Sequence, residues 1–470
     1  MKRSLINLIV SALLLGLGWF VPHSVFDVAL ETSTPLPSPT SVNLFPETIA
    51  LNPNGPTPVP TPVEEHDPYG ELYFSIIKSK EYEPSATPPP GVDESLTRLA
   101  RLPGSCVVGL VVCPAPEMVP TPFDMKDVLA TNNDSGALTW SPDGRYGLIV
   151  VHPADDFTRG WTDTEWEQFK KSDLSDLKIS SSTLYLFDAG NDTWSEIYRA
   201  DRKFFYSAHW SPDGQWIAFT VASSMLSIHP SHADDGIYVV RPDGSSLQPL
   251  GGSGYILGWV GNSILLFRFL HPGSPVDFSH VVEKLNFDGQ VMTMFESSRL
   301  VTYALAPDGG SLLAADSATR DGGSPQRAVD VLALDGSVIR SFGTFSNFSS
   351  AVFPFLWSPD GSQVAFAILH RLYVAPRISQ LDLPADTFGI PPDTRKVYEP
   401  DDPYVTPPYL DIQFSLDNKY LLMEVYDGFP HFVVTSLETG QSTPLAIPHM
   451  DPFVWDDNYL GDPSFFSWRQ

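Results

Sequence analysis

The residues best suited to chemistry lie in the segment His229–Gly236, which reads HPSHADDG. It brings two imidazoles and two carboxylates into one stretch, at His229, His232, Asp234 and Asp235. These ligand types suit zinc or a similar ion, and two histidines three residues apart can converge on one turn. An ordinary solvated loop ending in an Asp-Gly turn explains the same residues. We favour the loop, because no fourth ligand or supporting residue is evident.

Motifs for a nucleophile or a nucleotide are missing from the sequence. It holds no G-x-S-x-G elbow, no H-E-x-x-H, no phosphate-binding loop and no paired C-x-x-C, which removes the usual evidence for a hydrolase or a metalloprotease. Asp401 and Asp402 could help to hold a calcium ion. Exposed charges in the Pro-rich, acidic insertion Arg377–Tyr409 explain them as well. We predict no catalytic residues and no cofactor, with calcium left open.

The two cysteines, Cys106 and Cys113, lie in the stretch CVVGLVVC. A turn at Gly109-Leu110 would set them opposite each other in a compact hairpin. An oxidising compartment would then allow a disulfide, provided that the register brings the two Cβ atoms within reach. The alternative is a pair of free, buried thiols in a strand. We expect the disulfide.

A third group of candidate residues is aromatic. The insertion Val151–Lys178 contains TDTEWEQFKKSDL, in which Thr162 and Glu165 have capping-box spacing, so we expect a short amphipathic helix. Its neighbourhood carries three aromatic side chains that could form a partner-binding patch: Trp161, Trp166 and Phe169. More often such side chains anchor a helix to its own domain, and we favour that interpretation.

The repeated pentad WSPDG indicates the elements that must position these residues. Pro fixes φ at the first central position of a type I turn, Asp tolerates the second, and Gly can take the left-handed conformation that follows. Such a turn joins two antiparallel strands. Three intact copies occur: Trp140, Pro142, Asp143 and Gly144; Trp210, Pro212, Asp213 and Gly214; and Trp357, Pro359, Asp360 and Gly361. Degenerate copies have Trp259, Leu305, Phe414 and Trp468 at the tryptophan position.

The spacing of these anchors, about 50 residues, is typical of propeller blades or stacked arrays. A second hairpin follows within most repeats, at Ser182–Tyr198, Gly236–Leu250, Val282–Phe295, Ala328–Phe342 and Phe432–Ile447. Four antiparallel strands per repeat predict an all-β protein, a β-propeller. The aromatic anchor would fill the gap between neighbouring blades.

We predict seven blades, with six blades and an N-terminal cap as the alternative. The closing blade would combine the C-terminal strand at Trp468 with N-terminal strands, which removes exposed sheet edges. Candidate N-terminal strands are Gly70–Ser79, Ser105–Pro114 and Phe123–Thr131.

The WSPDG copies, each followed by an apolar strand, resemble the TolB-like, WD40-like propeller repeats of exported bacterial proteins. The resemblance covers residues 65–470. It implies a propeller fold shared by binding proteins, sensors and the propeller halves of peptidases. TolB itself carries a further α/β domain that the N-terminal residues here do not resemble, so a TolB-like transport role is not implied.

The N-terminal residues predict export. Two basic residues precede an apolar run of 17 residues, Leu5–Val21, so residues 1–24 form a signal peptide or an uncleaved membrane anchor. Residues 25–65 are rich in Pro, Thr and Ser and predict a disordered, extended linker, and residues 66–470 form the propeller. The net charge of −28 disfavours binding to nucleic acid and to anionic lipid.

From this we expect an exported, monomeric, non-catalytic propeller that binds a protein, a peptide or a glycan, because function in such folds lies in loops on a rigid ring. Contact with the membrane would be limited to residues 5–21. One alternative is a glycan- or peptide-processing hydrolase or lyase with carboxylates at the channel mouth. The other is a membrane-anchored extracytoplasmic sensor.

Overall fold

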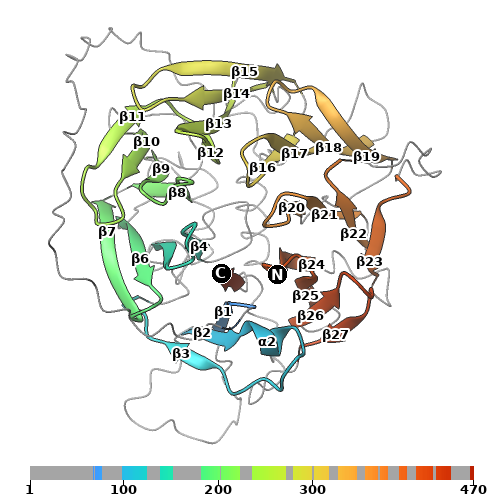
Figure 1. Ribbon diagram of the computed structural model, residues 1–470. Helices are drawn as coiled ribbons and strands as arrows, with labels where there is room; N and C mark the ends of the chain where they lie inside the picture. The colour runs from blue at the N-terminus through green and yellow to red at the C-terminus, as the bar shows by residue number, and fades with distance from the viewer. Residues whose placement is uncertain are drawn as a thin grey trace, which may run out of the picture. The chain divides into compact units, whose positions relative to one another are not determined.

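The structure is a computed structural model. It describes residues 67, 69–76, 98–123, 138–151, 181–201, 203–222, 235–270, 279–298, 301–316, 326–346, 355–368, 371–378, 391–399, 409–426, 430–445 and 466–469. Within these ranges, seven four-stranded antiparallel sheets are arranged in a ring (Figure 1). The predicted seven-bladed β-propeller is therefore confirmed.

The closing blade is built from both ends of the chain. Its order from the centre outward is β28 (Phe466–Arg469), β1 (Glu71–Ile76), β2 (Arg98–Pro103) and β3 (Glu117–Val119). The register pairs Leu72 of β1 with Trp468 of β28. The shared closing blade predicted from the sequence is confirmed, and β1 is its second strand.

The six other blades follow in chain order. The first contains β4 (Thr139–Trp140), β5 (Tyr146–Val151), β6 (Ser181–Asp188) and β7 (Thr193–Asp201), and the second β8 (Phe204–Trp210), β9 (Ile217–Ala222), β10 (Gly236–Val240) and β11 (Gln248–Gly251). The third contains β12 (Tyr255–Val260), β13 (Ser263–Phe269), β14 (His280–Leu285) and β15 (Val291–Ser297), and the fourth β16 (Val301–Leu305), β17 (Ser311–Asp316), β18 (Gln326–Ala333) and β19 (Val338–Ser346). The fifth contains β20 (Phe355–Trp357), β21 (Gln363–Ile368), β22 (Arg371–Pro376) and β23 (Arg395–Tyr398), and the sixth β24 (Tyr409–Phe414), β25 (Tyr420–Tyr426), β26 (Pro430–Ser436) and β27 (Ser442–Pro444).

Two expectations about the N-terminal strands were wrong. The segment Ser105–Pro114 is not a hairpin, because its first residues belong to a helical turn, α2 (Gly104–Val107). The third strand is β2, whose two arginines hid it from hydropathy patterning although Leu99 and Leu102 are buried. The outer strand is β3, ahead of the predicted Phe123–Thr131, of which the structure describes only Phe123.

The insertion Arg377–Tyr409 contains β23, the outer strand of the fifth blade.

The WSPDG turns have a common hydrogen-bond pattern. In the first copy Ser141 Oγ donates to Asp143 Oδ1 at 2.6 Å and accepts from Tyr146 N at 2.9 Å. Gly144 follows with φ of +67°, a conformation that glycine adopts without strain. The same pattern recurs at Ser211, Ser358 and Ser415. In the turn that begins at Ser415, Asn418 takes the place of the glycine, with φ of +57°.

The aromatic anchors join neighbouring blades by hydrogen bonds as well as by burial. The indole N–H of Trp210 donates to Thr139 O at 2.9 Å, that of Trp259 to His209 O at 3.2 Å, and that of Trp357 to Ala304 O at 3.0 Å. Each acceptor lies one residue before the anchor of the preceding blade. Seven buried apolar clusters fill the spaces between adjacent sheets.

Where leucine replaces tryptophan, the neighbouring backbone compensates. Leu305 packs against Gly258, whose φ is +140°, and a Cβ added at Gly258 would lie 2.9 Å from Leu305 Cδ2. Because Leu305 is shorter than tryptophan, the backbone at Gly258 lies close against it, in the space that an indole fills in other blades.

One side of the ring carries the tight turns between the first and second strands of the six blades that begin with β4, β8, β12, β16, β20 and β24, and the connection from β2 to β3 of the closing blade. We call it the turn face. In the part of the chain that the structure describes, no helix is long and apolar enough to cross a membrane.

Candidate functional site

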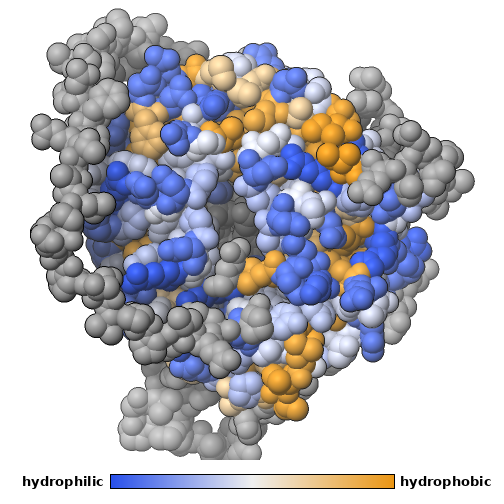
Figure 2. All heavy atoms as spheres, in the orientation of Figure 1, coloured by the Kyte–Doolittle hydropathy of each residue, from blue (hydrophilic) through white to orange (hydrophobic). Residues whose placement is uncertain are grey.

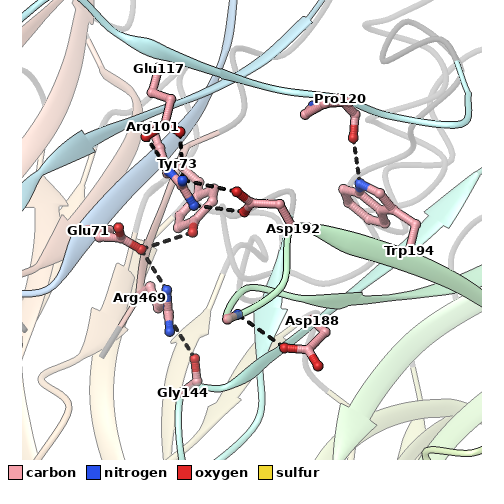
Figure 3. A network of polar contacts seen from close by, with 11 residues as sticks. Glu71, Tyr73, Arg101, Glu117, Pro120, Gly144, Asp188, Asp192, Trp194 and Arg469 are labelled. Carbon is pink, nitrogen blue, oxygen red and sulfur yellow. Dashed lines mark hydrogen bonds and ion pairs between the residues drawn. The ribbon is translucent and has the colours of Figure 1, made fainter. Parts of the chain in front are cut away.

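A network of charged side chains joins the closing blade to the first blade (Figure 3). Arg101 of β2 contacts Glu117 Oε1 of the neighbouring β3 at 2.8 Å and Asp192 Oδ1, in the turn between β6 and β7, at 2.8 Å. The hydrogen bond from Arg101 lowers the pKa of the Glu117 carboxyl, and the same bond raises the pKa of the guanidinium. Arg101, only 15% exposed as a side chain, is thereby committed to two carboxylates.

The inner half of this network is formed by the chain ends. Arg469 Nη1 contacts Glu71 Oε2 at 2.6 Å, while its Nε donates to Gly144 O in the first WSPDG turn at 2.9 Å. The Tyr73 hydroxyl donates to the same Glu71 oxygen at 2.9 Å. Burial, and then the negative charge of Glu71, raise the pKa of Tyr73 to about 12. The network in Figure 3 therefore fixes the closing blade against its neighbour on the turn face.

The tryptophan of the first blade completes this closure. Trp140 Nε1 donates to Ser467 Oγ at 2.9 Å, and Ser467 Oγ donates in turn to Leu138 O at 2.8 Å. The Tyr73 ring lies 5.0 Å from Trp140. This part of the molecule is rigid scaffolding, and its carboxylates and cations are paired with one another.

A disulfide loop, residues 106–113, lies on the other face of the closing blade, toward the sixth blade. Cys106 and Cys113 are bonded at 2.04 Å, with their Cα atoms 4.8 Å apart. Both cysteines are buried in the cluster that contains Leu72 and Leu102. The base of the loop is held at Ser105, whose backbone N–H donates to Asp67 Oδ2 at 3.0 Å.

The far side of the disulfide loop is apolar and exposed. Leu110 is 57% exposed, Val111 54% and Val112 92%. No ionisable side chain other than the two bonded cysteines occurs from Pro103 to Pro116. Figure 2 shows an apolar patch over the region where Figure 1 places α2 and the segment that follows it. Contiguous exposed aliphatic groups of this kind mark interaction sites.

Other exposed apolar side chains in the described ranges include Leu247 and Ile378, which lie singly in connections between strands, and pairs on outer strands. Val291 and Met292 begin β15, and Val338 and Ile339 begin β19, with exposures between 46% and 56%. They are pairs on edge strands of separate blades. The disulfide loop differs from them because three successive side chains project from one constrained segment.

Buried titratable groups are present but lie in different blades. Burial raises the pKa of Glu424 in β25 to about 8, and its Oε2 has no hydrogen-bond partner. Burial lowers the pKa of His209 in β8 to about 4. His280 Nε2 lies 2.8 Å from the Tyr303 hydroxyl between the third and fourth blades. The described residues contain no group of three or more His, Cys, Asp or Glu that could hold a metal ion.

Of the HPSHADDG segment, the structure describes only Asp235 and Gly236. Asp235 lies directly before β10, and its Oδ1 contacts Lys203 Nζ at 2.8 Å, with side-chain exposures of 1% and 11%. This buried pair gives Asp235 a structural role between β8 and β10. The other site residues considered above lie outside the described residues: His229, His232, Asp234, Trp161, Trp166, Phe169, Asp401 and Asp402.

Comparison with known proteins bears on the fold. No family model and no curated protein matches the chain. Among solved structures it is similar to TolB from Acinetobacter baumannii, at 13% identity over 80% of this chain and 63% of that one, with a TM-score of 0.36. The chain spans less than two thirds of the TolB chain.

Two further solved structures, a β-propeller domain and a lyase, are similar to this chain at low sequence identity. The Cps50 (Swd1) β-propeller domain from Myceliophthora is 10% identical over 67% of this chain and 87% of that domain, with a TM-score of 0.39. An oligogalacturonate lyase from Vibrio parahaemolyticus is 11% identical over 80% and 86%, with a TM-score of 0.45.

The exposed loop residues were missed by sequence reasoning. Leu110, Val111 and Val112 form an apolar run typical of a buried strand, and their exposure depends on the helical turn of α2. One signal was present: the run is bounded by two cysteines only seven positions apart, and a closed loop that short cannot supply two paired strands of usual length.

Proposed function

We propose that this protein is an exported, non-catalytic propeller that binds another molecule of the cell envelope through loops on its rigid ring. The observation that supports this most strongly is the disulfide loop. It presents three exposed aliphatic side chains from a base that the disulfide closes. A disulfide persists in an oxidising compartment, which agrees with the apolar N-terminal run and with export.

The proposal is tested on the full chain in cells that produce it. Maleimide trapping of intact cells is expected to find Cys106 and Cys113 oxidised and the chain in the extracytoplasmic fraction. Immunoprecipitation after cross-linking is expected to recover the chain with a second envelope component. Reduced cysteines in a cytoplasmic chain would contradict the proposal. So would turnover of a glycan or peptide library by the purified chain.

One observation favours a second candidate, a hydrolase or lyase. Burial raises the pKa of Glu424 to about 8, and a general acid at neutral pH needs a raised pKa of this kind. Its exposure is only 2%, and it packs between two blades beside Leu422 and Phe432. A Glu424→Gln variant separates the two candidates: loss of a measured turnover would favour the enzyme, and unchanged partner recovery without turnover favours the binding protein.

A membrane-anchored form of the binding protein depends on residues 1–24. Mass spectrometry of the mature N-terminus decides this point. A mature chain that begins at Met1 supports an anchored sensor, and one that begins near residue 25–35 supports a cleaved signal peptide.

A further inference from the structure

We propose that β15, the outer strand of the third blade, is a docking edge that takes an extended segment of another polypeptide as a fifth strand of its sheet. This inference goes beyond the proposed function, because it adds a second surface, on a different blade from the disulfide loop, and specifies the kind of segment that binds there. The seven outer strands of the ring differ in how their free edges are protected.

An outer strand has a partner strand on one side only, so its other side presents a row of unpaired backbone N–H and C=O groups. Natural sheets protect such edges with short strands, proline, charged side chains or an inward-pointing charge, because a bare edge pairs with other chains. The seven outer strands of this ring are β3, β7, β11, β15, β19, β23 and β27. All of them except β15 have at least one of these protective features.

Four of the outer strands are short. β3 and β27 have three residues each, and β11 and β23 have four each. Pro249 lies in β11 and Pro444 in β27. β23 begins with two exposed cationic residues, Arg395 and Lys396. None of these four edges offers a long, uncharged row of backbone groups.

The two longest outer strands, of nine residues each, are protected by charge. β7 carries Glu196 and Arg199, whose side chains are 41% and 47% exposed and form an ion pair. In β19 the side chain of Arg340 is only 5% exposed. Its guanidinium reaches Asp393 and Pro376 O, both in the part of the chain that forms the fifth blade. A buried charge of this kind disfavours the addition of another strand.

β15 has seven residues, VMTMFES, with no proline, and its one ionisable side chain is the penultimate Glu296. Val291 is 49% exposed and Met292 52%, and Thr293 after them is exposed as well. Figure 2 shows apolar surface along the upper rim, where Figure 1 places β15 and β19. The register with β14 shifts at Met294, but the third and fourth strands of four other blades also have such a shift. β15 is therefore the long outer strand without a protecting charge.

The chemistry of this edge determines its occupant. Alternating N–H donors and C=O acceptors are matched by the backbone of an extended peptide, and a lipid surface does not supply them. No charged residue occurs from Val291 to Phe295, so cross-strand pairing favours a segment with aliphatic or aromatic side chains beside Val291 and Met292. A second copy of the chain would offer the same edge, but each copy carries a net charge of −28, and like-charged copies repel each other. The occupant that fits is an uncharged, extended segment of a different polypeptide.

Selection of short random peptides, displayed on phage, against the immobilised full chain tests the inference. The selected peptides are expected to share an uncharged run with apolar residues at alternate positions. A synthetic peptide of this sequence should bind the Met292→Lys variant at least about tenfold more weakly than wild type, because the new charge protects the edge. The matched control is Val338→Lys, at a position 56% exposed on β19, and it should bind the peptide as wild type does. Both variants should unfold in urea as wild type does, because both positions are exposed.

Hydrogen exchange, read by mass spectrometry on the fragment that contains residues 291–297, separates strand addition from an apolar contact between side chains. Saturating peptide is expected to slow the outward-facing amides of this fragment at least about tenfold and to leave residues 338–346 unchanged. Failure to select a peptide, unchanged exchange at 291–297, or equal loss of binding in both variants would overturn the docking role. So would a dimer of the free wild-type chain that Met292→Lys dissociates, because the occupant would then be a second copy. The immunoprecipitation that tests the proposed function does not depend on this edge, so either proposal can fail without the other.

Discussion

Removal of the disulfide should destabilise the fold by an amount that follows from its loop length. Cys106 and Cys113 are seven positions apart, so the bond closes a loop of about eight residues. For that length the loss of chain entropy in the unfolded state gives about 2.5 kcal/mol at 25 °C. Because both cysteines are buried in the closing blade, the double variant Cys106→Ala/Cys113→Ala also loses packing, and we expect a total of about 2.5–4 kcal/mol.

Urea unfolding of the purified chain, followed by tryptophan fluorescence, measures this change. Leu110→Ala is the matched control, since an exposed side chain in the same loop should alter the free energy of unfolding by less than about 0.5 kcal/mol. Wild-type chain treated with a reductant should approach the double variant. A difference below about 0.5 kcal/mol between the double variant and wild type would refute the reasoning, because the bond would then not stabilise the fold by restricting the unfolded chain.

Three further predictions concern the scaffold. Asp235→Ala removes the carboxylate of the buried Lys203–Asp235 ion pair and should cost about 3–5 kcal/mol in urea unfolding. Asp192→Ala, at a more exposed pair, should cost about 1 kcal/mol or less, and equal costs would contradict the buried pair. Burial raises the pKa of Glu424 in the folded state, so the folded state holds a proton that the unfolded state releases. The free energy of unfolding should therefore fall as pH rises from about 4.5 to about 8. The Glu424→Gln variant should lose that part of the pH dependence, and an unchanged profile would argue against a protonated carboxyl. Trp210→Phe removes the bond to Thr139 O and should cost about 1 kcal/mol or somewhat more, measured in the same way, and a neutral result would reduce this anchor to simple packing.

The sequence was sufficient for the blades because turn chemistry and apolar spacing agree there. Ser141, Pro142, Asp143 and Gly144 specify one turn geometry, and their repetition specifies the ring. The same reasoning did not find the hydrogen bond from each indole to the preceding blade, because residue type shows that Trp210 is apolar and bulky but not which carbonyl its N–H meets.

The candidate site was harder to predict because it depends on local exceptions. The run around Val112 has the hydropathy of a core strand, yet a short helical turn and a disulfide expose it. Strand β2 was not predicted because Arg101 interrupts its apolar pattern, although Glu117 of the same blade and Asp192 of the first blade pair with that charge. Both errors arise where specific partners, rather than hydropathy patterning, determine the environment of a side chain.

The claim on which the account depends is that the C-terminal strand β28 completes the blade that carries the disulfide loop. Native-state hydrogen exchange, read by mass spectrometry on the peptides that contain residues 71–76 and 466–469, tests it most directly. We predict that the amides of β1 and β28 exchange as slowly as those of inner strands such as β8 and β12. Fast exchange of the 466–469 amides in a chain whose other blades remain protected would contradict it.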